Sequence, residues 1–517
     1  MSGDRREGRS ATAVGAGIFL SRITGFVRDL MIARFFGTTL AADAYAAALK
    51  IPNVIRNLLG EGALSAAFVP VYSSLLAGES ARTTVPSLLA RRVLGRLVLL
   101  AGILSALGVA LAPWLTRIVA PGFDADASAL TAQLVRILFP MAGVMILAAW
   151  CLGVLTSHRR FFLPFAAPVL WNLSQVAGLL LAARLGWGPL IHVLAWSTLA
   201  GSILQLLVQL PTARALAGGV RPLLDRGSEP VRRVMRNMVP VAASQGIFQL
   251  ASFADVLLAS FLPSGAVVGL YYAQRLAYLP LSLIGISVAT AALPEMSRDT
   301  DATVMRSRLV NGFFQILYFV LPASIALMLF GDLAVRIIFE RGAFGEQSTH
   351  LVAGILIAYA VGLVATSSLK LFAGGFHAMQ DTRTPMRLAA VSVVTGIALG
   401  AACMWIMRGA GFGALAAAGL AFGGSAGAWL NLALLWSGLR RRVGVLFDHT
   451  MIGSLLRIGL ASVAGGAVGV GARLVLARQV GEAGTFDAAI TLVGTLAAAG
   501  VVYLSIVPRP PRPVSDV

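Results

Sequence analysis

Ten ionisable side chains lie inside stretches of this chain that are otherwise apolar, and they are the residues best placed to do chemistry. Six are basic and four are acidic: Arg22, Arg28, Asp29, Asp43, Lys50, Arg56, Glu61, Asp255, Arg275 and Lys370. Arginine stays charged in apolar surroundings, and its planar guanidinium donates paired hydrogen bonds to phosphate and carboxylate groups. Because basic groups outnumber acidic ones, the set favours binding of an anion, with no covalent step required.

The stretches that carry these charges are predicted to cross a membrane. Of the 517 residues, 58% are hydrophobic and 12% are charged, and the mean hydropathy is +0.83. Soluble domains carry about 25% charged residues. The composition therefore excludes a disordered chain and a secreted disulfide framework, and it predicts an all-α polytopic membrane protein.

Apolar stretches of about 20 residues, enough to cross about 30 Å of hydrocarbon, predict fourteen transmembrane helices. They lie at 11–35, 41–76, 93–116, 129–156, 162–183, 190–213, 237–260, 267–296, 309–329, 348–378, 388–405, 413–438, 450–477 and 486–507. The first stretch continues into SRITGFVRD without a small-residue cleavage site, so we expect it to be retained as a span rather than removed as a signal peptide.

The net charge of +19 is explained by loops on one side of the membrane rather than by nucleic-acid binding. With both termini inside, most loop arginines fall in inner loops. The outer loops hold Arg117, Arg184, Arg336, Arg341, Arg408 and Arg478. The positive-inside rule therefore predicts cytoplasmic termini and a multi-pass protein of the bacterial cytoplasmic (inner) membrane.

An internal repeat is indicated by glycines and prolines at similar offsets. Gly153 and Pro164 return as Gly374 and Pro385 after 221 residues, and Pro70 pairs with Pro294 after 224. Many transporters are built from two related halves. We expect an N-terminal lobe at 1–213 (spans one to six), a cytoplasmic linker at 214–236, a C-terminal lobe at 237–438 (spans seven to twelve), and two further helices with a tail at 439–517.

The depth of the arginines predicts a shared cavity. Arg22 and Arg28 lie near the middle of the first span, about 9 Å apart along the helix axis. Arg56 in the second span and Arg275 in the eighth reach a similar depth. Because alternating-access transporters bind substrate where their two repeats meet, we expect these arginines to converge between the lobes around a central cavity.

The alternative is that the charges pair with one another inside the protein. Arg28 would pair with the adjacent Asp29, Lys50 with Asp43 one heptad away, and Arg56 with Glu61. Pairing accounts for single residues more easily than for the four arginines together, because the ten groups keep a net charge of +2.

Other motifs predict no catalysis, metal site or cofactor. Asp124 and Asp126 form a DxD pattern of the kind found in metal-dependent glycosyltransferases, but they fall in a short outer loop. Cys151 and Cys403 are far apart in apolar runs, and the histidines are scattered. A membrane-embedded phosphatase or glycosyltransferase would need a nucleophile or a metal-binding acid pair at the membrane face. The chain is therefore interpreted as a transporter rather than an enzyme.

Several segments together resemble the MurJ (MviN) family of lipid II flippases, which belongs to the multidrug/oligosaccharidyl-lipid/polysaccharide exporter superfamily. They are SRITGFVRD (21–29), ADAYAAALKIPNVIRNLLGEGALSAAFVPVY (42–72), APWLTRIVAPGF (112–123), APVLWN (167–172), YYAQRLAYLP (271–280), FERGAF (339–344) and QDTRTP (380–385). They occur over most of the chain in the order that the family shows.

The resemblance implies transport of lipid II, the undecaprenyl-pyrophosphate-linked disaccharide-pentapeptide, to the outer leaflet for peptidoglycan synthesis. The family's substrate-binding cavity arginines match Arg22, Arg28, Arg56 and Arg275. Supporting cavity charges match Asp29, Asp43, Lys50, Glu61 and Lys370. The resemblance further implies that spans thirteen and fourteen hold the polyprenyl tail in a groove.

Two positions depart from the family pattern: Asn57, where some relatives have a second basic residue, and Gln274, where some have an acid. They leave the counter-ions and any ion coupling open. The alternative function is a flippase for another polyprenyl-diphosphate-linked oligosaccharide, and a scaffold for cell-wall enzymes is a further rival. Expected partners are lipid II, membrane lipids and cell-wall synthesis enzymes, with no nucleic acid.

Overall fold

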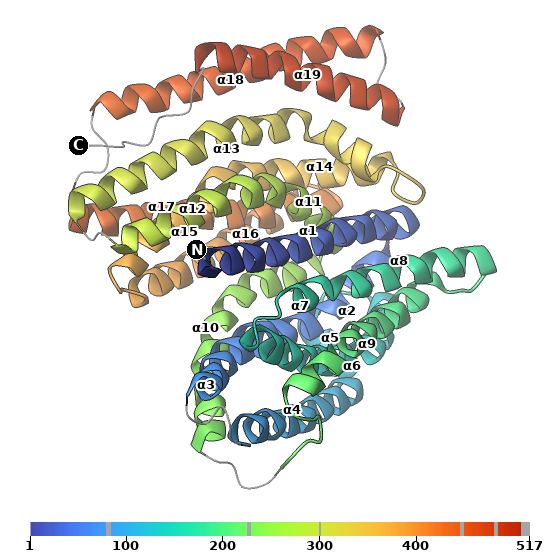
Figure 1. Ribbon diagram of the computed structural model, residues 1–517. Helices are drawn as coiled ribbons and strands as arrows, with labels where there is room; N and C mark the ends of the chain where they lie inside the picture. Colours follow the sequence, from blue (N-terminus) through green and yellow to red (C-terminus); the bar gives the residue numbers. More distant parts are fainter. Residues whose placement is uncertain are drawn as a thin grey trace. The chain divides into compact units, whose positions relative to one another are not determined.

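The computed structural model describes residues 2–78, 84–224, 229–298, 301–444, 449–479 and 484–507, which form helices joined by short turns. The packing of the helices divides the chain into two compact units, Met1–Phe261 and Leu262–Val517. Figure 1 labels the helices along the chain. Within its described residues the chain is all-helical, and it is a multi-pass membrane protein.

The first unit runs from α1 to α10, with a π-helical segment, η1, inside its second span. Its elements are α1 (Ser2–Phe36), α2 (Leu40–Ile55), η1 (Arg56–Leu64), α3 (Ser65–Ala77), α4 (Val85–Ala110), α5 (Ala112–Val119), α6 (Ala125–Ser157), α7 (Phe162–Ala166), α8 (Pro168–Leu185), α9 (Leu190–Leu216) and α10 (Glu229–Ala259).

The second unit runs from α11 to α19, with a π-helical segment, η3, and a 3₁₀ turn, η4. Its elements are α11 (Ala266–Pro280), η3 (Leu281–Gly285), α12 (Ile286–Arg298), α13 (Ala302–Phe339), α14 (Glu346–Val361), α15 (Leu363–Ala378), α16 (Arg383–Gly409), η4 (Gly413–Ala416), α17 (Ala417–Val443), α18 (His449–Gln479) and α19 (Thr485–Ile506).

Each of the fourteen predicted spans falls on a helix or on consecutive helices. Among the described residues, ten helices are long and apolar enough to cross a membrane, or eleven if the bent pair α14 and α15 counts as one span. The predicted spans outside this set are α1, α10 and α11–η3–α12. They carry Arg28, Asp255 and Arg275 among other charges, and charged groups lower the mean hydropathy of a span.

Helix α6 shows how the sequence builds the core of the first unit. Asp124 caps its N-terminus by accepting a hydrogen bond from the backbone N–H of Ala127 at 2.8 Å, which accounts for half of the DxD pattern structurally. Trp150 is fully buried and donates from Nε1 to the carbonyl oxygen of Ala90 on α4 at 3.0 Å. In the second unit α13 has the equivalent central place, with Phe313 packed against Phe372 of α15.

The second span of the first unit and the opening span of the second unit are both interrupted by π-helical turns. Segment η1 begins at Arg56 and η3 begins at Leu281. Lys50 and Arg275 precede these two starts by the same number of residues. Because π turns are uncommon and occur often at functional sites, their presence in both units draws attention to these spans.

The repeat is visible in the helix boundaries. Helix α6 (125–157) and the pair α14–α15 (346–378) begin and end at an offset of 221 residues, and α7 and α16 begin at the same offset. Arg159 and Gln380, also 221 apart, have φ values of 58° and 59°. Since few non-glycine residues adopt positive φ, this shared turn geometry supports a common ancestor for the two segments.

The contacts inside each unit group α10 with the first unit, where it packs on α2, η1, α3, α4 and α5. The sequence analysis assigns the corresponding span, 237–260, to the second lobe. The predicted boundaries of the lobes, the linker and the last two helices stay a prediction.

Candidate anion-binding site

Arg28 lies on α1 and is held by three hydrogen bonds from its guanidinium. Its side chain is buried, with 7% of the residue exposed. Nη2 and Nε donate to Oδ1 of Asp29 at 2.6 and 3.1 Å, and Nη1 donates to Oδ1 of Asn172 on α8 at 3.0 Å. The pairing of Arg28 with Asp29, the alternative drawn from the sequence, is therefore present. It lowers the cost of a buried guanidinium.

Asn172 joins α8 to α1 through both ends of its amide. While its oxygen accepts from Arg28, Nδ2 donates to the carbonyl oxygen of Ser21 and to Oγ1 of Thr24, both at 3.1 Å. Both donors and one acceptor of a buried amide are thus satisfied, which is what burial of a polar group requires. The arrangement fixes where the Arg28 guanidinium can lie.

Trp171 brings a second arginine to the same place. The Cζ atom of Arg28 lies 4.9 Å from the centre of the Trp171 ring, and the Cζ atom of Arg56 lies 5.9 Å from it. The indole Nε1 donates to the carbonyl oxygen of Thr198 on α9 at 3.1 Å. A guanidinium within about 6 Å of an indole gains roughly 0.5–2 kcal/mol. One tryptophan therefore positions cations from two different helices.

Arg56 stands at the first residue of η1 and is half-buried. Its Nη2 donates to Oδ1 of Asn57 at 3.5 Å. Asn57 is one of the two departures from the family pattern, and here it supplies a neutral acceptor where some relatives have a second cation. The side chain of Glu61, the acid suggested for Arg56, lies outside the described residues.

The remaining predicted residues of the first unit occupy three different settings. Arg22 is exposed on α1. Asp43 is buried in the first turn of α2, where the helix N-terminus stabilises a carboxylate. Lys50 is half-buried and hydrogen-bonds Ser252 of α10 through Nζ, with Asp255 close enough for electrostatic attraction. These contacts give Lys50 partners on α10 in place of the suggested heptad partner Asp43.

The predicted cations of the second unit are both exposed. Arg275 on α11 donates from Nη2 to the hydroxyl of Tyr271 at 2.9 Å, and its Cζ atom lies 4.9 Å from the centre of that ring. Lys370 on α15 donates from Nζ to Oγ1 of Thr290 on α12 at 3.4 Å. The convergence of Arg275 with the arginines of the first unit stays a prediction.

Five polar residues that hold this site were not identified from the sequence. Besides Trp171 and Asn172, the hydroxyl of Tyr45 on α2 contacts Gln175 at 3.2 Å and Thr198 at 2.7 Å. Trp171, Asn172 and Gln175 follow one face of α8 at the spacing of one helical turn. Three large polar side chains on one face of an apolar span are the signal that points to them.

Within the described ranges, no group of three or more His, Cys, Asp or Glu side chains is arranged to hold a metal ion. The chemistry that the site offers is recognition of negative charge by guanidinium groups of defined orientation.

Known proteins share both the sequence and the fold. The family model described as "Lipid II flippase MurJ" matches residues 32–482. The chain is 33% identical over 444 residues to "Lipid II flippase MurJ" of Burkholderia cenocepacia, with 84% of each chain covered. It is 32% identical over 508 residues to "Probable lipid II flippase MurJ" of Rhizobium meliloti, with 95% of this chain and 92% of that one covered.

Among solved structures, one described as "Lipid II flippase MurJ, inward closed conformation" matches with a TM-score of 0.78 and 23% identity, over 96% of this chain and 99% of that one. An inward-facing multidrug resistance transporter of the MATE family matches with a TM-score of 0.64 and 15% identity, over 82% of this chain and 95% of that one. These two likenesses establish the fold.

Proposed function

The chain belongs to the lipid II flippase MurJ family, and from this membership we propose that it carries lipid II from the inner to the outer leaflet of the bacterial cytoplasmic membrane. In this proposal Arg22, Arg28, Arg56 and Arg275 bind the pyrophosphate of the head group. The protein acts as a transporter and performs no covalent step. Both termini are cytoplasmic, as the positive-inside rule predicts.

The observation that carries the proposal is the shared position of Arg28 and Arg56 at Trp171. Two guanidinium groups from α1 and η1 lie within 6 Å of the centre of one indole ring. A diphosphate presents oxygens on two neighbouring phosphorus atoms, so two oriented guanidinium groups match it better than one. Hydrogen bonds between charged partners are about twice as strong as neutral ones.

Asp29 gives the site a means of releasing its ligand. In the absence of substrate it accepts two hydrogen bonds from Arg28, so the buried guanidinium is already compensated. A pyrophosphate oxygen that displaced Asp29 would exchange one anionic acceptor for another. Because the exchange is nearly balanced, substrate can bind without being trapped, and a modest difference between two conformations is enough to drive alternating access.

A head group as polar as a glycosylated pyrophosphate cannot cross hydrocarbon unaided, whereas its lipid tail can stay in the bilayer. The proposed protein therefore supplies a polar path that opens to one leaflet and then to the other. Membrane lipids and lipid II are the partners that this function requires, and cell-wall synthesis enzymes are proposed as suppliers and consumers of the substrate.

The test is lipid II flipping by purified protein in vesicles, read as lipid II that becomes accessible to a cleaving enzyme added to one side. We expect Arg56→Ala to abolish flipping. Arg28→Lys, which keeps the charge of the buried pair but loses the fork, should reduce flipping at least about tenfold. Arg34→Ala removes an exposed arginine from the same helix as Arg28 and serves as the matched control. Normal flipping by both variants, each eluting as folded protein, would refute the proposal.

The alternative function, flipping of another polyprenyl-diphosphate-linked oligosaccharide, uses the same arginines and differs only in the sugar. Competition separates the two. Lipid II should inhibit its own labelled analogue more strongly than other lipid-linked oligosaccharides do, and the reverse order would favour the alternative.

A further inference from the structure

The hairpin of α18 and α19 packs on α13 within the second unit, and the two helices lie side by side along it (Figure 1). Helices in a membrane are not driven together by the hydrophobic effect, because lipid tails are as apolar as leucine. Close packing and polar contacts must hold the hairpin in place. The contacts between the hairpin and α13 differ greatly at the two ends.

One end is a buried anchor built around a proline. Pro322 of α13 has no N–H, so the carbonyl oxygen of Tyr318, one turn earlier, loses its usual helical donor. The hydroxyl of Tyr503 on α19 donates to that oxygen at 2.7 Å, and the hydroxyl of Tyr318 donates to the carbonyl oxygen of Val507 at 3.2 Å. All three of these hairpin and α13 residues are less than 9% exposed.

The other end is a single ion pair that reaches the surface. Arg473 of α18 donates to both carboxylate oxygens of Asp332 on α13, at 3.0 and 2.6 Å, and also to the carbonyl oxygen of Leu329 at 3.3 Å. The side chains of Arg473 and Asp332 are 23% and 38% exposed. At 1.5 Å per residue, Asp332 lies about 21 Å along α13 from Tyr318.

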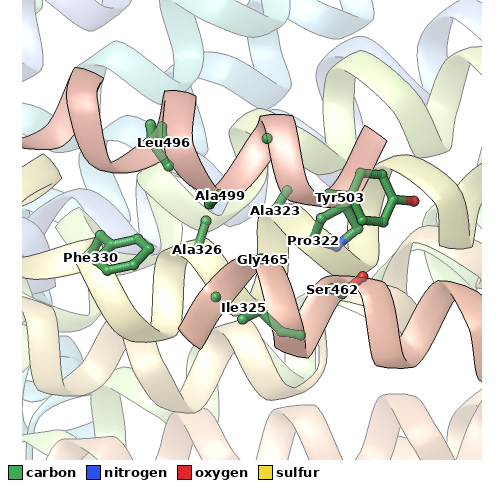
Figure 2. Close-up of a pocket in the computed structure, with 12 residues that line it drawn as sticks. Pro322, Ala323, Ile325, Ala326, Phe330, Ser462, Gly465, Leu496, Ala499 and Tyr503 are labelled. Atoms are coloured by element: carbon green, nitrogen blue, oxygen red, sulfur yellow. The ribbon is translucent and has the colours of Figure 1, made fainter. Parts of the chain in front are cut away.

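Between the two ends the packing is incomplete. A cavity of about 210 Å³ lies between α13, α18 and α19, and its walls are almost entirely apolar (Figure 2). Gly465 and Gly466 of α18 face Ala499 of α19 and Ile325 of α13, so small residues leave the space open. Atoms that line a cavity lose dispersion contacts, so this stretch stabilises the docked hairpin less than a filled one would.

We propose that the α18–α19 hairpin pivots on α13 about the Tyr318–Tyr503 anchor, and that the Arg473–Asp332 pair is the latch that holds its other end closed. The buried anchor stays formed because releasing it would leave the Tyr318 carbonyl without a donor in the membrane. The latch can open because both of its groups reach solvent or lipid head groups. Opening widens the apolar cavity toward the membrane. The proposal concerns motion within the second unit and does not depend on which lipid is transported.

Two spin-label pairs in the full chain, reconstituted in lipid with Cys151 and Cys403 replaced by serine, separate the two ends. The latch pair joins labels at Arg341→Cys and Arg478→Cys. The anchor pair joins labels at Phe319→Cys and Leu504→Cys. Pulsed dipolar spectroscopy then gives the distance distribution at each end.

With Arg473→Gln, the latch pair should gain a second, longer population that the unmutated latch holds below about 10%, while the anchor pair stays unchanged. Arg457→Gln removes an exposed arginine from the same helix and should change neither pair. The charge swap Asp332→Arg with Arg473→Asp should restore the short distance. An unchanged latch pair in Arg473→Gln, an equal change at both ends, or a failure of the swap to restore the distance would overturn the proposal.

Discussion

The two units contain the same helices at a constant spacing and use them for different purposes. On α8, Trp171, Asn172 and Gln175 hold the arginine site through hydrogen bonds to three other helices. The positions 221 residues later, on α16, are Ser392, Val393 and Gly396. A Cβ atom on Gly396 would lie 2.9 Å from the carbonyl oxygen of Gly423 on α17. The first unit therefore uses this helix to position charge, and the second uses it for close packing.

The π-helical spans show the same divergence at a single pair of positions. Lys50 and Arg275 stand equally far before η1 and η3, and both are cations. Lys50 is half-buried against Ser252 and near Asp255, whereas Arg275 is exposed and stacked on Tyr271. A repeated position can thus retain its charge while its partners decide between a structural role and a binding role. The predictions below test this difference.

The largest effect is expected from removing the two equivalent cations. Arg275→Met should reduce lipid II flipping by about 100-fold or more with little loss of stability, because its guanidinium is exposed and available to the head group. Lys50→Met should instead destabilise the fold by about 1–3 kcal/mol, since it leaves Asp255 without its cation. Flipping in vesicles and thermal unfolding in detergent measure the two outcomes.

The double change Lys50→Met with Asp255→Asn serves as a control for the structural role. Removing both members of a pair costs far less than removing one, so the double variant should recover most of the lost stability. If Arg275→Met unfolds the protein while Lys50→Met only slows flipping, the two roles are assigned the wrong way round.

A smaller effect should follow from the repeated position on α8 and α16. Asn172→Ala removes the acceptor for Arg28 and both donors to α1, so the guanidinium loses its fixed position and flipping should fall about tenfold. Val393→Ala, at the same place in the repeat, should leave flipping unchanged. Restoration of flipping by Asn172→Gln would argue against a requirement for position, because the longer amide keeps the chemistry but moves the oxygen.

The sequence predicted the helices well because hydropathy acts over a whole span. All fourteen predicted spans fall on helices, and the offset of 221 between Gly153 and Gly374 is repeated in the boundaries of α6 and α14–α15. The π-helical turns could not be predicted, because they depend on packing and Arg56 or Leu281 carries no sequence mark of them. The break between α14 and α15 likewise falls at Gly362, inside one long apolar run.

The candidate site was predicted only where charge exposed it. Arg28 and Asp29 stood out as charges in an apolar span, and their pairing followed from adjacency. The contact of Lys50 with α10 could not be read from the sequence, because Ser252 and Asp255 lie some 200 residues away in the chain. Trp171 and Asn172 were quoted only as part of a family segment, because a neutral polar side chain in a span has no visible partner until the helices are packed.

The smallest effect concerns the repeated turn at the start of α7 and α16. At Arg159–Arg160 and Gln380–Asp381 the backbone follows the same path, with N–H donation from Arg160 to Leu155 and from Asp381 to Phe376. Arg160 is exposed. Asp381 accepts hydrogen bonds from the backbone N–H and hydroxyl of Thr384 at 3.0 and 2.7 Å, and from Arg442 at 2.6 Å.

The Thr384 backbone N–H, the Thr384 hydroxyl and the Arg442 guanidinium hold the pKa of Asp381 well below its ordinary value. A carboxyl with a lowered folded-state pKa stabilises the fold above its unfolded pKa of about 3.9 and loses that contribution as the pH falls further. Asp381→Ala should therefore lower the thermal midpoint slightly at pH 7, and the difference from wild type should shrink below about pH 4. Arg160→Ala should show no difference at either pH. An Asp381→Ala deficit that stays constant down to pH 3 would mean that the turn, rather than the ionised carboxylate, supplies the stability.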